Sequence, residues 1–485
     1  MPALSILLTG ATGYVGGLLL PLLESRGHRV RCLARRPGRL RQRAHPATEI
    51  VEGDVRDPAS LSRAMAGIDA AVYLIHSMGS AGSFEQTDRE AAQRFGAAAA
   101  QAGVRRIVYL GGLGDSRDDL SPHLRSRRET GEVLRESGVP VIELRASIVI
   151  GAGSLSFEMV RSLVERLPVM ICPKWVAVKA QPIAVDDVLA YMAAAVEDET
   201  SGSVVCEIGG PDVVSYGDIM REYARQRGLT RLLIPVPLLT PRLSSLWLRL
   251  VTPLYAIVGR WLIDGMRNQT IVTDAEPARR YALKPRGLTQ AVTEATRQRG
   301  QRLEALLTEA AGPDAEAALT ALRASGCVLD HREAAVEASL ARAFDPVRRI
   351  GGANGYYYGN PFWALRAWFD RLIGGIGMRR GRRDPDTCMV GDAVDFWRVV
   401  AFEPDRRLTL SAEMKMPGRA WLQFDVVPGK EGEDARVRQT ALFDPRGLLG
   451  LLYWVSMLPA HAFIFGGMLR AIAARGGYQT PGSHP

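Results

Sequence analysis

The sequence predicts an α/β unit with a doubly wound parallel sheet, followed by an α+β domain built on an antiparallel sheet. Up to about Ile150, apolar runs alternate with helical patterns in β-α-β-α order. After Arg332 the pattern changes to strands in which apolar and polar residues alternate. The chain has 485 residues, more than one hydrophobic core normally serves, so we expect at least two domains.

The first part of the chain contains the elements of the parallel sheet. Runs rich in Val, Ile and Leu predict strands that are buried on both faces, with helices covering each side. The crossovers between these strands must be right-handed. The predicted strands are 5–8, 30–34, 50–52, 70–75, 107–110 and 141–144, and the predicted helices are 16–26, 89–102 and 127–137.

Changes in this pattern set the domain boundaries. Residues 151–300 have mixed character with a few weak helices, as expected of a substrate-side lobe within domain 1–300. An Ala-rich, charged stretch broken at Gly312 predicts a helical linker over 301–335. Domain 336–485 follows, with predicted strands at 395–400, 407–414, 420–426 and 436–443.

The composition is typical of a soluble globular protein. Hydrophobic residues make up 47% and charged residues 23% of the chain, which excludes a disordered, fibrous or polytopic membrane protein. The net charge of +9 favours phosphate-bearing ligands or anionic surfaces as partners. The five cysteines include no C-x-x-C pair, so the sequence encodes neither a metal site nor a disulfide framework. The N-terminus lacks the pattern of a signal peptide, and we expect a cytoplasmic protein.

A glycine-rich turn joins the first predicted strand to the first helix with G-x-x-G-x-x-G spacing. The first glycine allows a tight turn, the second lets the backbone approach a pyrophosphate, and the third lets helix and strand pack closely. The diphosphate would meet the helix N-terminus, whose N–H groups and dipole favour negative charge. The alternative is a purely structural turn. The residues predicted to bind a dinucleotide here are Gly10, Thr12, Gly13, Tyr14, Val15 and Gly16.

The end of the second strand indicates which dinucleotide binds. A site for NAD usually presents an acidic residue to the ribose 2′-hydroxyl, whereas Arg35 and Arg36 stand here. A guanidinium can hold a 2′-phosphate by paired charge-assisted hydrogen bonds, which favours NADP(H). The alternative is that both arginines are merely solvated.

Two further segments follow predicted strands and should border the same ligand. Asp54 and Val55 come after the third strand, where we expect the adenine. Ile75 and His76 come after the fourth strand and should run beside the nicotinamide ribose.

From residue 3 to about residue 300 the sequence resembles the atypical branch of the short-chain dehydrogenase/reductase superfamily, whose members have a Rossmann fold and the motif T-G-A-T-G-x-x-G. In that superfamily the tyrosine of a Tyr-x-x-x-Lys pair donates a proton to the substrate carbonyl. The lysine lowers the pKa of the tyrosine and holds the ribose. At the matching positions this sequence has His123 and Arg127.

This replacement allows two interpretations. His123 can act as the acid, since an unperturbed pKa of about 6.5 suits proton transfer at neutral pH, while Arg127 supplies permanent positive charge near the cofactor. Alternatively, dehydrogenase chemistry is lost and His123 is an ordinary polar residue.

Two further pairs of residues stand at positions that the resemblance makes informative. Gly111 and Gly112 stand where a catalytic serine is common, and they leave room for cofactor or substrate. Asp186 and Asp187 resemble a helix start, and we expect them to cap the helix rather than to form a catalytic pair.

Residues from about 336 to 480 resemble the family of uncharacterised domains DUF2867, which look like relatives of the START-type (SRPBCC) helix-grip fold. The resemblance rests on 377–385, 390–399 and 414–422. A curved sheet wrapped on a long helix would make an apolar cavity for small or lipid-like molecules. The aromatic residues that either line it or form an ordinary core are Phe396, Trp397, Trp421, Phe424 and Trp454.

The basic residues of this domain do not indicate a nucleic-acid partner. We expect the arginine cluster at 379–383 to be a solvated turn, with phosphate or headgroup contact as the alternative. No aromatic residues are interleaved with it, so we predict no nucleic-acid binding.

Two apolar segments raise the question of membrane contact. Residues 448–469 have about the length that spans a bilayer. Pro459, His461 and the resemblance to a helix covered by its own sheet argue against spanning. Residues 243–266 carry arginines and a proline, and they are predicted to lie at a membrane interface if they touch one.

Together these patterns predict an NADPH-dependent oxidoreductase that reduces a small hydrophobic, lipid-like substrate, with the second domain helping to enclose it. The first alternative is a non-catalytic NADP(H)-binding sensor or assembly factor, which the loss of the Tyr-Lys pair favours. The second is a carrier of hydrophobic ligands at a membrane surface. The sequence does not determine the substrate or the oligomeric state.

Overall fold

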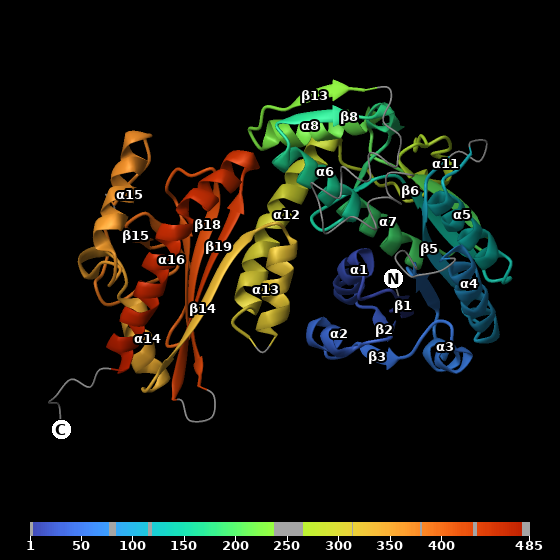
Figure 1. Cartoon of the computed structure of the whole chain (residues 1–485). Coiled ribbons are helices and arrows are strands. Elements are labelled where there is room, and N and C mark those ends of the chain that lie inside the picture. Colours follow the sequence, from blue (N-terminus) through green and yellow to red (C-terminus); the bar gives the residue numbers. More distant parts are fainter. Residues whose placement is uncertain are drawn as a thin grey trace. The chain divides into compact units, whose positions relative to one another are not determined.

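The computed structural model describes residues 3–76, 84–114, 119–236, 265–312, 314–378, 381–429 and 434–477. The chain divides into two compact units, Met1–Arg299 and Gly300–Pro485, which are described separately (Figure 1). Most of the segment 243–266, predicted to be interfacial, lies outside the described residues.

The first unit is built on a seven-stranded sheet with the order β11-β6-β5-β4-β1-β2-β3, and every neighbouring pair is parallel. The order reverses between β1 and β4, which opens a crevice at their carboxyl ends. The doubly wound fold predicted from the sequence is therefore confirmed. The strands are β1 (Ser5–Thr9), β2 (Arg29–Ala34), β3 (Glu49–Glu52), β4 (Ala70–Tyr73), β5 (Arg106–Gly112), β6 (Val141–Ala146) and β11 (Val204–Ile208).

Helices cover both faces of this sheet because each buries an apolar stripe against it. One face packs on α1 (Tyr14–Ser25) and α7 (Val185–Glu197). The other packs on α3 (Pro58–Met65), α4 (Phe84–Gln101) and α5 (Pro122–Arg135).

The lobe after β6 has its own core. It contains β7 (Val149–Ile150), α6 (Leu155–Arg166), β8 (Val169–Cys172), the 3-10 helix η1 (Lys174–Ala177), β9 (Lys179–Ala180), β10 (Ile183–Ala184), β12 (Val214–Ser215), α8 (Tyr216–Gln226) and β13 (Leu232–Pro235). The described part of the first unit also contains the short helices α2 (Gly38–Arg43) and α11 (Glu276–Arg279), and α12 (Leu288–Glu309) leads into the second unit.

The second unit contains a six-stranded antiparallel sheet with the order β14-β19-β18-β17-β16-β15. Its strands are β14 (Val328–Val336), β15 (Ala393–Val394), β16 (Trp397–Glu403), β17 (Arg407–Ala412), β18 (Gly418–Pro428) and β19 (Ala435–Pro445). The predicted antiparallel domain is confirmed. The range 301–335 differs from the predicted linker, because it ends in β14 and this strand pairs with β19 along its length.

Helices pack on both faces of the second sheet. One face buries side chains of α14 (Leu340–Arg348), α15 (Asn360–Leu372) and α16 (Gly447–Gly477), with the 3-10 helix η3 (Gly352–Asn354) between α14 and α15. The other face packs the end of α12 and α13 (Ala315–Ala324) around Trp421. Among the described residues, α16 is the one helix long and apolar enough to cross a membrane by length and composition.

Candidate functional site

The glycine turn between β1 and α1 is shaped by close backbone contacts. Gly10 has a φ of +73°, and a Cβ there would lie 2.7 Å from the carbonyl oxygen of Leu74. A Cβ at Gly16 would overlap the carbonyl oxygen of Gly10. The N–H of Gly13 donates to that same carbonyl at 2.8 Å. The first and third glycines therefore have the roles that the sequence predicts.

The start of α1 fits a diphosphate. Gly13 is the N-cap of the helix and is exposed, with no side-chain capping hydrogen bond among the described residues, and the first turn lacks acidic residues. Thr12 is exposed beside it, while Tyr14 and Val15 are half-buried at the beginning of the helix. A bare helix N-terminus of this kind attracts an anion through its N–H groups and its dipole.

The predicted adenosine end of the site carries three arginines. Arg35 and Arg36 are both exposed immediately after β2. Arg56 forms a two-point contact with Asp54, with Nη2 at 2.9 Å from Oδ2 and Nε at 3.2 Å from Oδ1. This hydrogen bond lowers the pKa of Asp54, and the charge of Arg35 adds to the effect. The backbone N–H of Gly53 donates to the carbonyl of Ala34 at 3.2 Å, so the loops that carry Arg35 and Asp54 lie side by side.

Not all predicted binding residues present their side chains to solvent. Val55 is buried in the core between the sheet and α3 and α4, and Ile75 packs against the same core. They shape the floor beneath the loops after β3 and β4.

A buried chain of three polar side chains lies after β4. Nδ1 of His76 is 2.7 Å from Oδ2 of Asp88 on α4, and Nε2 of His76 is 3.3 Å from Nδ1 of His123 on α5. Asp88 is 3% exposed, and both histidines are mostly buried. The structure thus brings the predicted cofactor residue His76 together with the predicted catalytic residue His123.

The two histidines do not titrate as isolated imidazoles. Burial lowers the pKa of His76, although the hydrogen bond to Asp88 opposes the change. Burial, the charge of Arg127 and the neighbouring His76 lower the pKa of His123 to about 3. The pKa of His123 therefore lies below the neutral range expected from the sequence, because burial and the charge of Arg127 disfavour the imidazolium form.

Arg127 lies one helical turn after His123 on α5. Its guanidinium donates to the carbonyl of Leu110 at the end of β5 and lies 5.5 Å from the centre of the Tyr109 ring. The hydroxyl of Tyr109 donates back to the carbonyl of Arg127 at 2.9 Å. These contacts fix the position of a permanent positive charge near His123.

Asp88 is the one member of these three hydrogen-bonded residues that is not predicted from the sequence. It shares the buried stripe of α4 with Ala91, Ala92 and Phe95, at i, i+3, i+4 and i+7. An acidic residue on the apolar face of a helix is costly to bury without a partner. The acidic residue on the apolar face of α4 was therefore the sequence feature that could have indicated a functional role for Asp88.

The two glycines at the end of β5 serve packing rather than ligand access. A Cβ at Gly112 would lie 2.9 Å from a methyl group of Leu124 on α5, and a Cβ at Gly111 would lie 3.1 Å from the buried carboxylate of Glu143. The expectation that they leave room for cofactor or substrate is therefore wrong.

The acidic pair at the start of α7 also has another role. The N-cap of α7 is Ala184, and neither carboxylate caps the helix. Asp187 accepts from the backbone N–H of Arg286 at 2.7 Å and from its guanidinium at 3.0 Å, while Asp186 accepts from Gln298. The prediction of an N-cap is wrong, and the pair instead anchors the segment before α12.

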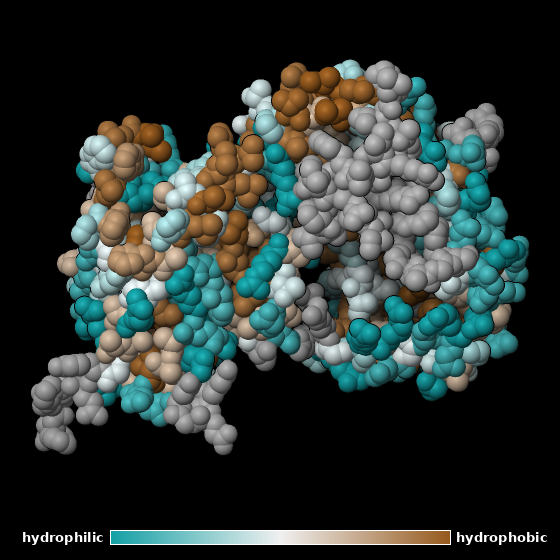
Figure 2. Space-filling model, viewed as in Figure 1, coloured by the Kyte–Doolittle hydropathy of each residue, from teal (hydrophilic) through white to brown (hydrophobic). Residues whose placement is uncertain are grey.

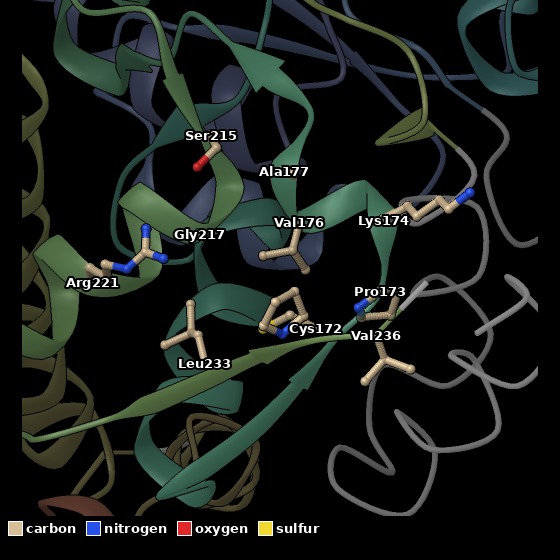
Figure 3. A pocket seen from close by; sticks show the side chains of 11 residues that line it. Cys172, Pro173, Lys174, Val176, Ala177, Ser215, Gly217, Arg221, Leu233 and Val236 are labelled. Atoms are coloured by element: carbon tan, nitrogen blue, oxygen red, sulfur yellow. The ribbon is translucent and has the colours of Figure 1, made fainter. Parts of the chain in front are cut away.

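The lobe contains a separate cavity of about 380 Å³ between β8, β13, η1 and α8 (Figure 3). Cys172, Val176 and Leu233 give it apolar walls, and Lys174 and Arg221 are its charged residues. Arg221 is paired with Asp218 at 2.8 Å. None of the predicted cofactor or catalytic residues lines this cavity.

The second unit contains an apolar cavity of about 280 Å³ between α15, α16 and the sheet. Of the five aromatic residues predicted either to line a cavity or to form the core, Trp397 and Trp454 line it. Phe396 and Phe424 belong to the core, and Trp421 packs on the opposite face of the sheet.

The arginine cluster of this unit is structural where it is described. Arg382 donates to backbone carbonyls, among them that of Thr387 at 2.9 Å, and Arg383 pairs with Asp392 at 3.0 Å. Arg379 and Arg380 lie outside the described residues. The expectation of a solvated turn is wrong for Arg382, which is half-buried and holds a neighbouring loop, whereas Arg383 is exposed as expected.

Family models match both units. Residues 10–151 match a family described as NAD(P)H-binding, and residues 327–468 match a family described as a protein of unknown function, DUF2867. Among solved structures, the triphenylmethane reductase of Citrobacter sp. superposes with a TM-score of 0.51 at 17% identity, covering 60% of this chain and 99% of that one. At this identity the similarity shows the fold.

Curated relatives are similar to the first unit. The chain is 40% identical over 136 residues to a (4-alkanoyl-5-oxo-2,5-dihydrofuran-3-yl)methyl phosphate reductase of Streptomyces griseus, spanning 28% of this chain and 44% of that protein. It is 27% identical over 240 residues to a ceramide reductase of Caulobacter vibrioides, spanning 48% and 73%. The chain thus spans less than half the length of the Streptomyces relative. Together the matches show an NAD(P)H-binding domain in the first unit, which has a Rossmann fold, and a DUF2867 domain in the second unit.

Proposed function

We propose that the first unit is an NADPH-dependent reductase that reduces a carbonyl group of a small hydrophobic, lipid-like substrate. The observation that carries this proposal is the buried chain Asp88–His76–His123 beside the crevice between β1 and β4. In folds of this type ligands bind in that crevice. A buried carboxylate connected to two imidazoles provides a route for a proton to the crevice.

The residues of the glycine turn and of the loop after β2 would hold the cofactor. The backbone from Gly10 to Gly16 would bind the diphosphate, and Arg35 and Arg36 would bind a 2′-phosphate, which favours NADPH over NADH. When bound, the nicotinamide supplies the hydride. The protein must then supply a proton to the oxygen that accepts the electrons.

Hydrogen-bond complementarity determines how the two histidines would move that proton. When His76 is protonated, its Nδ1–H is donated to Asp88 and its Nε2–H to Nδ1 of His123. His123 then carries its own proton on Nε2 and can give it to the substrate oxygen. As it does so, its Nδ1 takes the proton from His76, which ends neutral against Asp88. His123 is therefore neutral both before and after the transfer.

Arg127 favours this route over direct protonation of His123. Its fixed charge is one of the causes that lower the pKa of His123, so a second positive charge on that ring is disfavoured. His76 has the carboxylate of Asp88 as a direct partner, and the proton is held there. Arg127 is thus a positioning residue in this proposal, and His123 is the catalytic acid.

The names of two relatives support an apolar chain on the substrate. The Streptomyces enzyme is named for an alkanoyl compound and the Caulobacter enzyme for ceramide. We propose a cytoplasmic location with peripheral access to such molecules. Binding of NADPH without turnover would favour the alternative of a non-catalytic sensor.

Calorimetry and turnover test the proposal on the full chain. NADPH should bind more tightly than NADH, and Arg35→Ala combined with Arg36→Ala should weaken NADPH binding at least about tenfold, the loss of one charge-assisted contact. Arg29→Ala with Arg105→Ala is the matched control, since both arginines are exposed and lie at the amino ends of strands, Arg29 as the first residue of β2 and Arg105 directly before β5. Consumption of NADPH with long-chain aldehydes and ketones should be abolished by His123→Ala. Unchanged NADPH affinity in the variant with Arg35→Ala and Arg36→Ala would refute the cofactor assignment.

A further inference from the structure

Helix α15 exposes a row of apolar side chains. Its buried face contributes Trp363 and Ala367 to the core of the second unit. Each exposed residue has another three or four positions away, so together they form one face of the helix. They are Phe362, Leu365, Trp368, Phe369 and Leu372.

The first half of α16 exposes a second row. Its second half, from Ile464, is buried against the sheet and α14. In the first half Trp454 is buried against Phe443 of β19, but most other large apolar side chains are exposed, so the predicted covering by the sheet is complete only in the second half. From Gly447 to Leu469 the sequence contains no Asp, Glu, Lys or Arg. The exposed apolar residues of the first half are Leu448, Leu449, Leu452, Val455, Leu458 and Phe463.

The two rows form one surface, which we call the α15/α16 face. They meet where the rings of Phe362 and Phe463 lie 6.2 Å apart. Figure 2 shows apolar side chains gathered at the upper ends of both helices. The apolar cavity of the second unit lies between the same helices, lined by Phe362 and Phe369 from one and by Met457 and His461 from the other.

Leaving this face in water is costly. Leu449 is 73% exposed, Leu372 62% and Val455 60%. Soluble monomers rarely expose contiguous apolar patches of several large side chains, and such patches usually mark an interaction site. The face therefore needs an occupant.

The charges around the face indicate which occupant. Arg366 and Arg371 lie on α15 itself, and Arg446 directly precedes α16. Lys415 donates from Nζ to the carbonyl of Ile373, just after α15, at 3.1 Å. Arg371, Lys415 and Arg446 are exposed. Asp370, the one acidic residue of the two helices, is fully buried and accepts from the backbone N–H groups of Gly377 at 2.9 Å and Lys415 at 2.7 Å. The rim is therefore basic.

We propose that the α15/α16 face docks in the interface of an anionic membrane. The apolar side chains would enter the boundary between headgroups and acyl chains, with Trp368 at the level where tryptophan is enriched, and the basic rim would contact anionic headgroups. A symmetric dimer through this face would place one basic rim against another. Spanning is excluded because the second half of α16 is core. The cavity then opens toward the acyl chains.

Vesicle sedimentation with the full chain tests this proposal independently of NADPH turnover. The chain should bind vesicles of phosphatidylcholine with about a third phosphatidylglycerol, less at high salt, and only weakly to pure phosphatidylcholine. Leu449→Glu combined with Val455→Glu should lower the partition coefficient at least about tenfold, because two apolar side chains that would be buried in the membrane interface are lost. Arg371→Gln and Arg446→Gln should each weaken it by about fivefold.

Met389→Glu combined with Val390→Glu is the matched control. Met389 and Val390 belong to the same unit, are 62% and 65% exposed, and lie outside α15 and α16. Their replacement by glutamate adds the same charge as the replacements on α16. This control variant should bind as the unchanged chain does. Three outcomes would overturn the proposal. The two double variants could lose vesicle binding equally, or the unchanged chain could bind neutral and anionic vesicles equally well. The chain could also form a stable dimer that Leu449→Glu with Val455→Glu converts to a monomer.

Discussion

Nε2 of His76 lies 3.3 Å from Nδ1 of His123, which joins the loop after β4 to the first turn of α5. The other nitrogen of His76 is 2.7 Å from Asp88 on α4. Three elements that follow one another in the chain thus place a carboxylate and two imidazoles in line at the carboxyl edge of the sheet. The order of these groups determines the direction in which a proton can move.

Asp88→Asn should slow the reduction about a hundredfold, toward the lower end of what a positioned acid contributes. The amide oxygen can still accept from Nδ1 of His76, so the geometry is retained while the charge that stabilises protonated His76 is lost. NADPH affinity should not change. Glu90→Gln, an exposed substitution on the same helix, is the control variant. The test compares kcat of the Asp88→Asn and Glu90→Gln variants, measured at one pH. Equal kcat values would show that Asp88 is not coupled to the reaction.

The reduction should become faster as the pH falls. The proton is held by His76, whose pKa lies below its ordinary value because of burial. Above that pKa the protonated form decreases about tenfold for each pH unit, and kcat/KM for the reduction should follow it. The reverse oxidation needs neutral His76 and should show the opposite dependence. Profiles of both directions measured across the acidic range test the assignment. A reduction rate that rises with pH would contradict it.

The sequence predicts the two sheets well because their patterns are local. Buried parallel strands have uninterrupted apolar runs, and half-exposed antiparallel strands alternate, so both periods are visible without knowledge of the fold. The helix α2 is not predictable in this way, because Leu40 is its one apolar residue. The strand β14 carries Asp330, Arg332 and Glu333, and its polar composition hides it within an apparently helical stretch.

The site is predictable to the extent that it is local in the chain. The glycine turn lies within seven consecutive residues, and the structure gives Gly10 and Gly16 the close contacts expected of them. The pair His76 and Asp88 is 12 residues apart, and His76 and His123 are 47 apart. Hydrogen bonds between residues so far apart in the sequence can be identified only once the positions of α4 and α5 on the sheet are known. The exposed face of α16 is hidden for the same reason, because an apolar segment has the same composition whether or not a sheet covers it.

Gly16→Ala should destabilise the first unit and abolish NADPH binding. The added Cβ would overlap the carbonyl oxygen of Gly10, so the turn that would receive the diphosphate must open. Gly17→Ala is a close control in the same helix, because its Cβ would meet the carbonyl oxygen of Ala11 at 3.4 Å, an ordinary contact. That change should stabilise the helix by about 0.5–1 kcal/mol, since alanine loses less backbone entropy than glycine. The midpoint of thermal unfolding should therefore move in opposite directions in the two variants, and NADPH titration should show a loss of binding in Gly16→Ala alone.

Asp330→Asn should destabilise the second unit in a pH-dependent manner. Burial opposes ionisation of Asp330, but hydrogen bonds from His461 at 3.1 Å and Arg332 at 2.8 Å lower its pKa from 3.8 to about 2. A carboxylate with a lowered pKa stabilises the folded state fully above its unfolded pKa, and this stabilisation is lost as the pH falls through the folded pKa. After allowance for solvent screening it amounts to at most about 2 kcal/mol at pH 7.

Urea unfolding of the full chain and of the variant measures this contribution. The difference in unfolding free energy should be constant above about pH 5 and should shrink between about pH 4 and pH 2, because both forms then have a neutral group at this position. Asp405→Asn provides the control, since Asp405 is exposed in a turn and its φ of 60° is one that asparagine also adopts. A difference for Asp330→Asn that stays constant down to pH 2 would show that shape, and not charge, holds β14 to α16.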